Sequence, residues 1–326
     1  MIIAYFPDTD YYSIVINQSN LERLKEAAWI DLTSPTDEEH NWVETTLDMM
    51  IPSRAAMSEI EISSRLFSMQ ENLYMTATMV ATSMTMLPKD DAVTFILSQK
   101  RLITLRYMEP TAFSLFLNDM LPNMKDIICP PVLIFLRLLG MAVDHLADSL
   151  EHVVLQLDDY STRIFSPALS LPYSPGLNYT KLMQEIGVSA NLSGKSKESL
   201  LSLNRLISFF TQTTEIHLEH STIMHLQTLN KDILSLSDFA NFITTKIKFL
   251  LDATLGMVNI EQNNIIKIFS VAAVIFLPPT LIASIYGMNF LGMPELQWKY
   301  GYVVAIIMML VSAYIPYKFF KLRRWL

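Results

Sequence analysis

Cysteine and glycine are scarce in this sequence of 326 residues, and each shortage excludes a class of protein. The single cysteine, Cys129, excludes an intramolecular disulfide framework and is typical of a reducing compartment. The eight glycines form no glycine-rich phosphate-binding loop, and the chain contains no nucleophile motif of a hydrolase. We therefore expect that the protein is not an enzyme.

The N-terminus lacks a basic segment. Residues Met1 to Phe6 are apolar, but Asp8 and Asp10 follow at once and no lysine or arginine comes before them. A secretory signal peptide starts with a positively charged segment, so we expect none here.

Basic residues are the minority, and they are unevenly distributed. The chain has 24 lysines and arginines against 32 acids. Residues 1–264 carry a net charge of −13, whereas residues 265–326 hold six basic residues and one acid, Glu295. Binding to phosphates needs lysine and arginine, so the acidic N-terminal part argues against nucleic acid as a partner.

Two long stretches near the C-terminus contain no charged side chain. They run from Ile268 to Tyr286, 19 residues, and from Tyr300 to Tyr317, 18 residues. A helix rises about 1.5 Å per residue and the hydrocarbon core of a bilayer is about 30 Å thick, so each stretch can span a membrane. A short connection with Asn289 near its start joins them. An uncharged amide at the mouth of a membrane helix, with no catalytic group nearby, indicates a pore or a receptor.

Four basic residues after the second stretch predict the orientation of both spans. By the positive-inside rule, Lys318, Lys321, Arg323 and Arg324 place the C-terminal tail in the cytoplasm. Two spans return the chain to its starting side, so the N-terminal part is also expected in the cytoplasm. The expected segments are a cytoplasmic α/β domain (1–115), a cytoplasmic helical region (116–217), a stalk helix (218–267), a first span that lines a pore (268–286), an extracytoplasmic loop (287–299), a second span (300–318) and a basic tail (319–326).

The N-terminal part has two zones, which together predict a mixed α+β fold. In the first zone, β-rich runs at 27–32, 72–80, 92–97 and 102–105 predict strands, and Ser34-Pro-Thr-Asp-Glu-Glu predicts a helix start. In the second zone, apolar residues recur every three or four positions from Val132 to Leu157, as in an amphipathic helix. The breaker-rich patch 165–176 predicts the end of that helix, and Gly194-Lys-Ser-Lys predicts another loop.

The chain from Leu218 to Leu277 contains no proline and one glycine, Gly256. This composition predicts a very long helix that runs from the cytoplasm into the membrane. Two helices separated near Gly256 are the alternative.

One face of that long helix carries small and polar residues at a spacing of three to four. Such a stripe on a membrane helix suits either helix–helix packing or a wetted pore wall, and both interpretations stay open on composition alone. The stripe consists of Asn263, Ile266, Ser270, Ala273, Leu277, Thr280, Ser284 and Gly287.

The segment from Asn259 to Leu326 closely resembles the CorA family of divalent-cation channels. The matching elements are Phe276-Leu-Pro-Pro-Thr-Leu, Tyr286-Gly-Met-Asn-Phe, Met293-Pro-Glu-Leu-Gln-Trp and the basic aromatic end of the chain. Gly-Met-Asn alone is a weak signal, but between two spans and just before Met293-Pro-Glu-Leu it is specific. The N-terminal part resembles the family more weakly, and no match is made for about 160–200.

The resemblance implies a homopentameric, funnel-shaped Mg²⁺ channel in the bacterial inner membrane. Mg²⁺ gives up its shell of waters reluctantly, and a ring of neutral amides can hydrogen-bond that shell without removing it. By this resemblance Gly287, Met288 and Asn289 form the selectivity filter, with Asn289 as its outer ring, Gly287 allowing the turn out of the helix, and Tyr286 and Glu295 in support. The stripe would line the pore, and Leu277 and Ile266 would be its apolar constrictions.

The resemblance also implies feedback, in which cytoplasmic Mg²⁺ holds the pore shut. Mg²⁺ prefers oxygen ligands, so the candidate regulatory ligands are carboxylates. They are Asp232 and Asp252 on the long helix and Asp90 and Asp91 in a facing loop; the alternative is that each is an ordinary solvated acid. The histidines His217, His220 and His225 lack the spacing of a metalloprotease site and are expected on a helix surface.

Three alternatives to a Mg²⁺ channel remain. A zinc transporter on the same scaffold usually carries isoleucine in place of Met288, which disfavours it here. A non-conducting, membrane-anchored sensor would not need polar residues along the stripe. Co²⁺ and Ni²⁺ are further candidate ions, since a filter that contacts the water shell distinguishes size and charge more than ligand softness.

Overall fold

The computed structural model describes residues 1–6, 13–81, 88–123, 130–165, 178–214, 218–288, 294 and 298–323. These residues form two compact units, Met1–Leu251 and Asp252–Leu326, and the helix α7 (His220–Tyr286) contributes to both.

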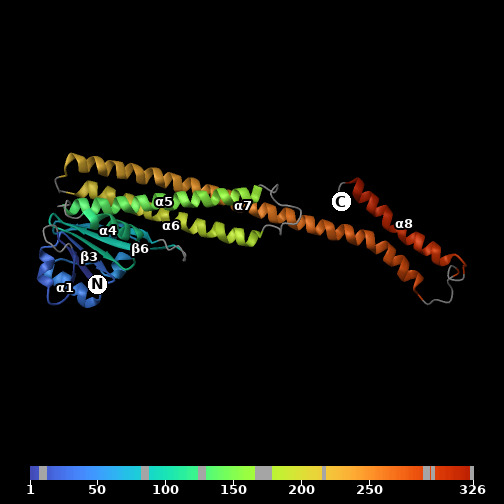
Figure 1. Cartoon of the computed structure of the whole chain (residues 1–326), viewed down its shortest axis with the longest axis horizontal. Coiled ribbons are helices and arrows are strands. Elements are labelled where there is room, and N and C mark those ends of the chain that lie inside the picture. Colours follow the sequence, from blue (N-terminus) through green and yellow to red (C-terminus); the bar gives the residue numbers. More distant parts are fainter. Residues whose placement is uncertain are drawn as a thin grey trace. The chain divides into compact units, whose positions relative to one another are not determined.

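The first unit is built on a mixed sheet of seven strands in the order β2-β1-β3-β7-β6-β5-β4 (Figure 1). Neighbouring strands β3 and β7 are parallel, and the other neighbours in this sheet are antiparallel. The strands are β1 (Ile2–Tyr5), β2 (Ser13–Ile16), β3 (Trp29–Thr33), β4 (Leu66–Met69), β5 (Asn72–Ala81), β6 (Lys89–Leu97) and β7 (Leu102–Arg106).

Helices cover both faces of this sheet (Figure 1). On one face, η1 (Leu21–Lys25), α1 (Asp37–Leu47) and α2 (Arg54–Met57) bury Leu24, Val43 and Met57 against the strands. The short α3 (Ile62–Arg65) leads into β4. On the other face lie α4 (Thr111–Asn123), α5 (Pro131–Phe165) and α6 (Tyr179–Thr213). Burial on both faces explains why every residue of β5 from Leu73 to Val80 is buried.

Aromatic rings join the sheet to the helices of the second face. The rings of Phe95 on β6 and Phe135 on α5 lie 5.4 Å apart, and those of Phe135 and Phe210 on α6 lie 5.3 Å apart. The indole of Trp29 on β3 contacts Phe116 on α4 edge-on, with ring centres 5.5 Å apart. All five of these side chains are buried, and aromatic residues of this size contribute strongly to core packing.

The mixed α+β fold is confirmed, and so are the predicted strands at 27–32, 72–80, 92–97 and 102–105. The predicted helix start is α1, where Thr36 and Glu39 form a capping box: the Glu39 N–H donates to Thr36 Oγ1 (3.2 Å) and the Thr36 N–H donates to Glu39 Oε2 (2.9 Å). The helix α5 ends at Phe165, where the breaker-rich patch begins; the rest of that patch lies outside the described residues.

The loop predicted at Gly194-Lys-Ser-Lys is wrong, because α6 continues through it. On this helix Leu192, Leu200 and Leu203 are buried, together with a row of serines. Ser189 Oγ donates to Gln156 Oε1 of α5 (2.8 Å) and Ser199 Oγ donates to the Thr78 carbonyl of β5 (2.8 Å). Packing against α5 and β5 therefore stabilises α6, although its glycine and serine residues have a low helix propensity.

The long helix is confirmed as a single element, α7, which has 67 residues and includes both Pro278 and Pro279. The alternative with two helices separated near Gly256 is not found. The helix α8 (Gly301–Leu322) follows it and runs in the opposite direction to the C-terminal part of α7 (Figure 1).

A buried ion pair lies between the two parallel strands at the centre of the sheet. Arg106 Nη2 on β7 donates to Asp31 Oδ2 on β3 (2.9 Å), and neither side chain is more than 4% exposed. Thr104 Oγ1 donates to Asp31 Oδ1 (2.6 Å) and in turn accepts from Trp29 Nε1 (3.0 Å). The Arg106 guanidinium also lies 4.8 Å from the centre of the Phe113 ring. Every polar group of the pair therefore has a partner, which is the condition for keeping two charges inside a core.

Candidate ion pathway

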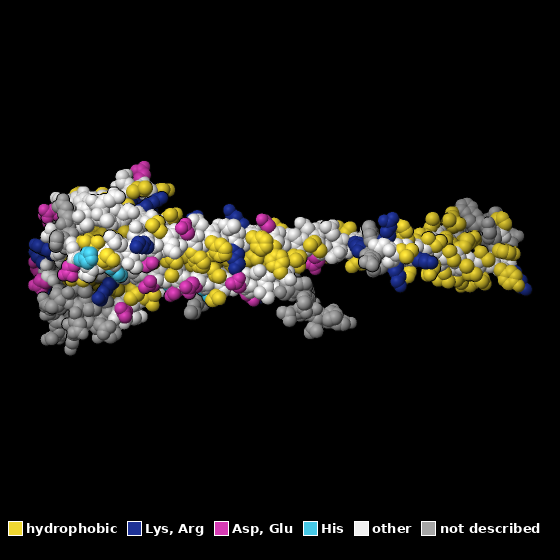
Figure 2. Space-filling model, turned by 90° about the horizontal axis from the view of Figure 1, so that it is seen from above, with side chains coloured by type: hydrophobic (Ala, Val, Ile, Leu, Met, Phe, Trp, Pro, Cys, Tyr) yellow, Lys and Arg dark blue, Asp and Glu magenta, His cyan; other side chains and the backbone are white. Residues whose placement is uncertain are grey.

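The C-terminal unit contains two helices that are apolar and long enough to cross a membrane. The best 18-residue windows of α7 and α8 have mean hydropathies of 2.2 and 1.9, and only 6% of each window is buried. On the face that Figure 2 shows, hydrophobic side chains predominate at the C-terminal end of the molecule. Leu277 and Leu281 on α7 and Leu310 on α8 are each more than 60% exposed. Such a surface needs lipid or further protein around it.

Every residue of the predicted stripe lies on α7 or directly after it, and every one is exposed in the single chain. Ile266 is 53% exposed and Leu277 is 65% exposed. Residues spaced three and four apart share one side of a helix. The exposed set is Asn263, Ile266, Ser270, Ala273, Leu277, Thr280, Ser284 and Gly287.

Two hydroxyl groups of the stripe donate to the helix backbone. Ser270 Oγ donates to the Ile266 carbonyl (2.8 Å), and Thr280 Oγ1 donates to the Phe276 carbonyl (2.7 Å). These bonds satisfy the hydrogens of both hydroxyls within the helix and leave their oxygen lone pairs available to water.

Two prolines interrupt the hydrogen-bond pattern of α7 beside Thr280. Pro278 and Pro279 have no N–H, so the carbonyls of Val274 and Ile275 lose the donors that a regular helix supplies four residues later. The backbone stays helical through both prolines. The stripe thus passes a place where two main-chain oxygens are available to another donor.

Gly287 ends α7 for a different reason from the one expected. It does not have a positive φ, so the glycine is not required by the turn itself. Its N–H donates to the Ala283 carbonyl (2.9 Å), and a Cβ at this position would lie 3.1 Å from that same oxygen. Close approach to the preceding turn therefore favours glycine here.

The rest of the predicted filter is only partly described. Tyr286 is half-buried and Met288 is 44% exposed, with its N–H donating to the Ile285 carbonyl (3.2 Å). Asn289 and Glu295 lie outside the described residues, as does Arg324 of the basic tail. Lys318, Lys321 and Arg323 are exposed near the end of α8.

Two of the predicted regulatory carboxylates already have basic partners within the chain. Asp90 and Asp91 lie on strand β6 and not in the loop that was expected, because both pair with β5, and Asp90 forms an ion pair with Lys195 on α6. Asp91 lies 3.8 Å from the Arg54 guanidinium of α2, and its Oδ1 accepts from the Ala92 N–H (2.8 Å). A cation that binds either carboxylate must compete with these groups.

The other two lie on α7 and have different surroundings. Burial raises the pKa of the Asp144 carboxyl on α5. The nearby carboxylates of Asp148 and Asp232 raise this pKa further, whereas His225 lowers it. Asp252 is exposed. In the described part of the chain, no group of three or more His, Cys, Asp or Glu is placed to hold a metal ion. The four predicted regulatory ligands are therefore not assembled into one site within a single copy.

Sequence reasoning did not identify the partners of these acids. Lys195 and Asp90 lie 105 residues apart, and neither position stands out in the sequence. The proximity of Asp232 to Asp144 and Asp148 could have been predicted from the sequence. The helices α5 and α7 are both amphipathic and carry acids at their polar positions, and packing of two such helices can bring the acids together.

The comparisons with known proteins agree over most of the chain. A family model described as "CorA-like Mg2+ transporter protein" matches residues 25–324. The magnesium transport protein CorA of Haemophilus ducreyi is 32% identical over 318 residues, 96% of each chain. That of Escherichia coli K12 is 34% identical over 304 residues, 93% of each chain.

Two solved structures share the fold at low sequence identity. The complete CorA magnesium transporter of Methanocaldococcus jannaschii has a TM-score of 0.76 at 17% identity and covers 100% of this chain and 99% of its own. The full-length CmaX protein has a TM-score of 0.67 at 17% identity and covers 99% and 97%. The family match and the identity to these relatives show that the chain belongs to the CorA-like Mg²⁺ transporter family.

Proposed function

We propose that this protein carries Mg²⁺ across the bacterial inner membrane as a homopentameric channel, with both termini in the cytoplasm. Its relatives are named as magnesium transport proteins, and its family is one of transporters rather than enzymes. The observation that carries the proposal is the exposed stripe of small and polar residues on α7, which a single copy leaves uncovered. Identical stripes placed around an axis would enclose a pathway lined by small and polar groups.

Within that pathway, Asn289 is the proposed selective group. Five amides at the mouth can hydrogen-bond the water shell of Mg²⁺ and leave the shell in place. Further in, the hydroxyls of Ser270 and Thr280 offer lone pairs to the same waters, and Leu277 and Ile266 form apolar constrictions that close by dewetting. Co²⁺ and Ni²⁺ are proposed as additional ions because such a filter contacts water and not the metal.

The proposal is tested by reconstituting the full chain into liposomes that contain a Mg²⁺ indicator. External Mg²⁺ should enter these liposomes and should not enter protein-free ones. Entry that is equal in both would reject transport. A zinc transporter would instead favour Zn²⁺, and a membrane-anchored sensor would pass neither ion.

Oligomeric state is the first prediction. Native mass spectrometry in mild detergent should show a pentamer, because the exposed stripe of α7 needs identical neighbours around water. A chain that stays a monomer or dimer while it still transports Mg²⁺ would show that the stripe does not line a shared pathway.

Regulation by Mg²⁺ is the second prediction. The described acids of one copy do not form a metal site, so we propose that Asp232 and Asp252 meet Mg²⁺ together with acids of a neighbouring copy. Changing both to asparagine should raise the Mg²⁺ concentration that protects the soluble part from protease by roughly tenfold or more, since Mg²⁺ affinity follows the number of charged ligands.

The matched control for this pair changes Asp238→Asn and Glu261→Gln, two exposed acids on the same helix. It removes the same charge and should leave protection unchanged. Equal shifts in both double variants would indicate a general charge effect, and no shift in either would place the sensor elsewhere.

A further inference from the structure

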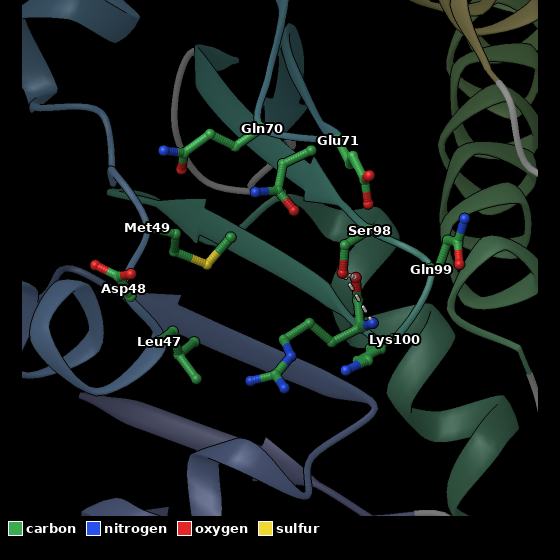
Figure 3. Close-up of a pocket in the computed structure, with 10 residues that line it drawn as sticks. Leu47, Asp48, Met49, Gln70, Glu71, Ser98, Gln99 and Lys100 are labelled. Carbon is green, nitrogen blue, oxygen red and sulfur yellow. Dashed lines mark hydrogen bonds between the residues drawn. The ribbon is translucent and has the colours of Figure 1, made fainter.

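A cavity outside the ion pathway lies at one end of the sheet. It measures about 300 Å³, opens to solvent and is lined by the C-terminal end of α1, the β4–β5 turn and the β6–β7 turn. Figure 3 shows Asp48 on one side, Lys100 on the opposite side, and Gln70 and Glu71 between them. A volume of this size is at the small end of the range for binding sites of small molecules.

The two opposite sides of the cavity carry opposite charges. Asp48 caps the C-terminus of α1, whose last turn holds no basic residue, so the helix dipole adds to the negative potential of the carboxylate. Lys100 and Arg101 supply positive charge on the other side, and Arg101 is held there by donating to the carbonyls of Leu24 (3.1 Å) and Lys25 (3.1 Å).

The charges that face the cavity are not neutralised inside the chain. Among the described residues, no ion pair within 4.0 Å joins Asp48, Glu71 or Lys100 to another group. The side chains of Asp48, Glu71 and Lys100 are exposed to solvent. A ligand with one positive and one negative end could therefore contact both.

Backbone strain is concentrated around the same cavity. In the described chain, four residues other than glycine have a positive φ, and three of them line the cavity: Asp48 (50°), Gln70 (50°) and Glu71 (64°). A two-residue turn such as Gln70-Glu71 normally contains Asn-Gly, because both positions need a positive φ. Unfavourable conformations of this kind cluster at ligand sites, where they hold side chains in place.

We propose that this cavity binds a small amino carboxylate, with its ammonium group against Asp48 and its carboxylate against Lys100. The amides of Gln70 and Asn72 supply further hydrogen bonds along the side between them. This site is separate from the ion pathway and independent of the transport proposal.

The test uses isothermal titration calorimetry on the full chain in detergent. The probes are glycine, β-alanine, 4-aminobutyrate and 6-aminohexanoate, with butyrate and butylammonium as the two singly charged halves. At least one amino carboxylate should bind about tenfold or more tightly than either half, because both of its charges find a partner. Equal binding of a half, or no binding of any amino carboxylate at about 10 mM, would overturn the proposal.

Two variants locate the binding to this cavity. Lys100→Gln should weaken the tightest amino carboxylate by about tenfold or more, whereas Lys89→Gln, an exposed lysine at the opposite end of β6, should not. Thermal unfolding without ligand checks that both variants fold. Unchanged affinity in Lys100→Gln, or an equal loss in both variants, would contradict the assignment.

Discussion

Replacing Asn289 with alanine should abolish Mg²⁺ entry while the oligomer still assembles. The change removes the proposed ring of amides from the mouth of the pathway, and alanine there cannot hydrogen-bond the water shell of the ion. The change lies outside both helices, because α7 ends at Tyr286 and α8 begins at Gly301. We therefore expect both helices to form in the variant. Entry is measured with a Mg²⁺ indicator in liposomes, and assembly by native mass spectrometry.

A matched control is available on α7. Asn241 is exposed on α7 within the first unit, so Asn241→Ala removes an amide without touching the predicted filter. It should transport at the wild-type rate. Asn289→Gln keeps the amide on a longer side chain and should retain partial entry. Near-normal entry in Asn289→Ala would reject Asn289 as the selective group.

Replacing Asp31 with alanine should give the largest loss of stability in the first unit. It leaves the Arg106 guanidinium buried without its counter-charge, and removing one partner of a buried pair costs about 3–5 kcal/mol. For a domain of this size that corresponds to a fall in melting temperature of roughly 10 °C. Circular dichroism of the full chain in detergent measures it.

The control for Asp31 is an exposed ion pair. Asp159 lies 3.4 Å from Arg163, and its side chain is 63% exposed. Asp159→Ala should change the unfolding free energy by less than about 1 kcal/mol, because water screens such pairs. If Asp31→Ala is no more destabilising than Asp159→Ala, the buried pair does not contribute to the stability of the sheet.

The sequence predicted the elements whose pattern is long or local. The helix α7 was predicted from the absence of proline and glycine over many residues, and α1 from its capping sequence. The strands β1, β2 and β4 were missed because each has four residues, too few for a period to appear. The helix α6 was misread at Gly194 because its packing partners, α5 and β5, lie far away in sequence.

In the candidate ion pathway, too, only local patterns could be predicted from the sequence. The stripe is a local period and was found in the sequence, and its role in lining a pathway shared between copies stays a prediction. The pairing of Asp90 with Lys195 depends on contacts across 105 residues, which no local pattern reveals. The role of Gly287 was assigned to the turn, whereas in the structure a Cβ at this position would make a tight contact of 3.1 Å with the Ala283 carbonyl oxygen.

Ion uptake by the reconstituted chain decides whether this protein is a Mg²⁺ channel. Liposomes that hold an ion indicator are offered Mg²⁺, Zn²⁺ and Co²⁺ separately, at equal concentration and with protein-free liposomes beside them. The account predicts rapid entry of Mg²⁺, entry of Co²⁺ as well, and no preference for Zn²⁺. Entry of Zn²⁺ without Mg²⁺, or of no ion at all, would contradict it.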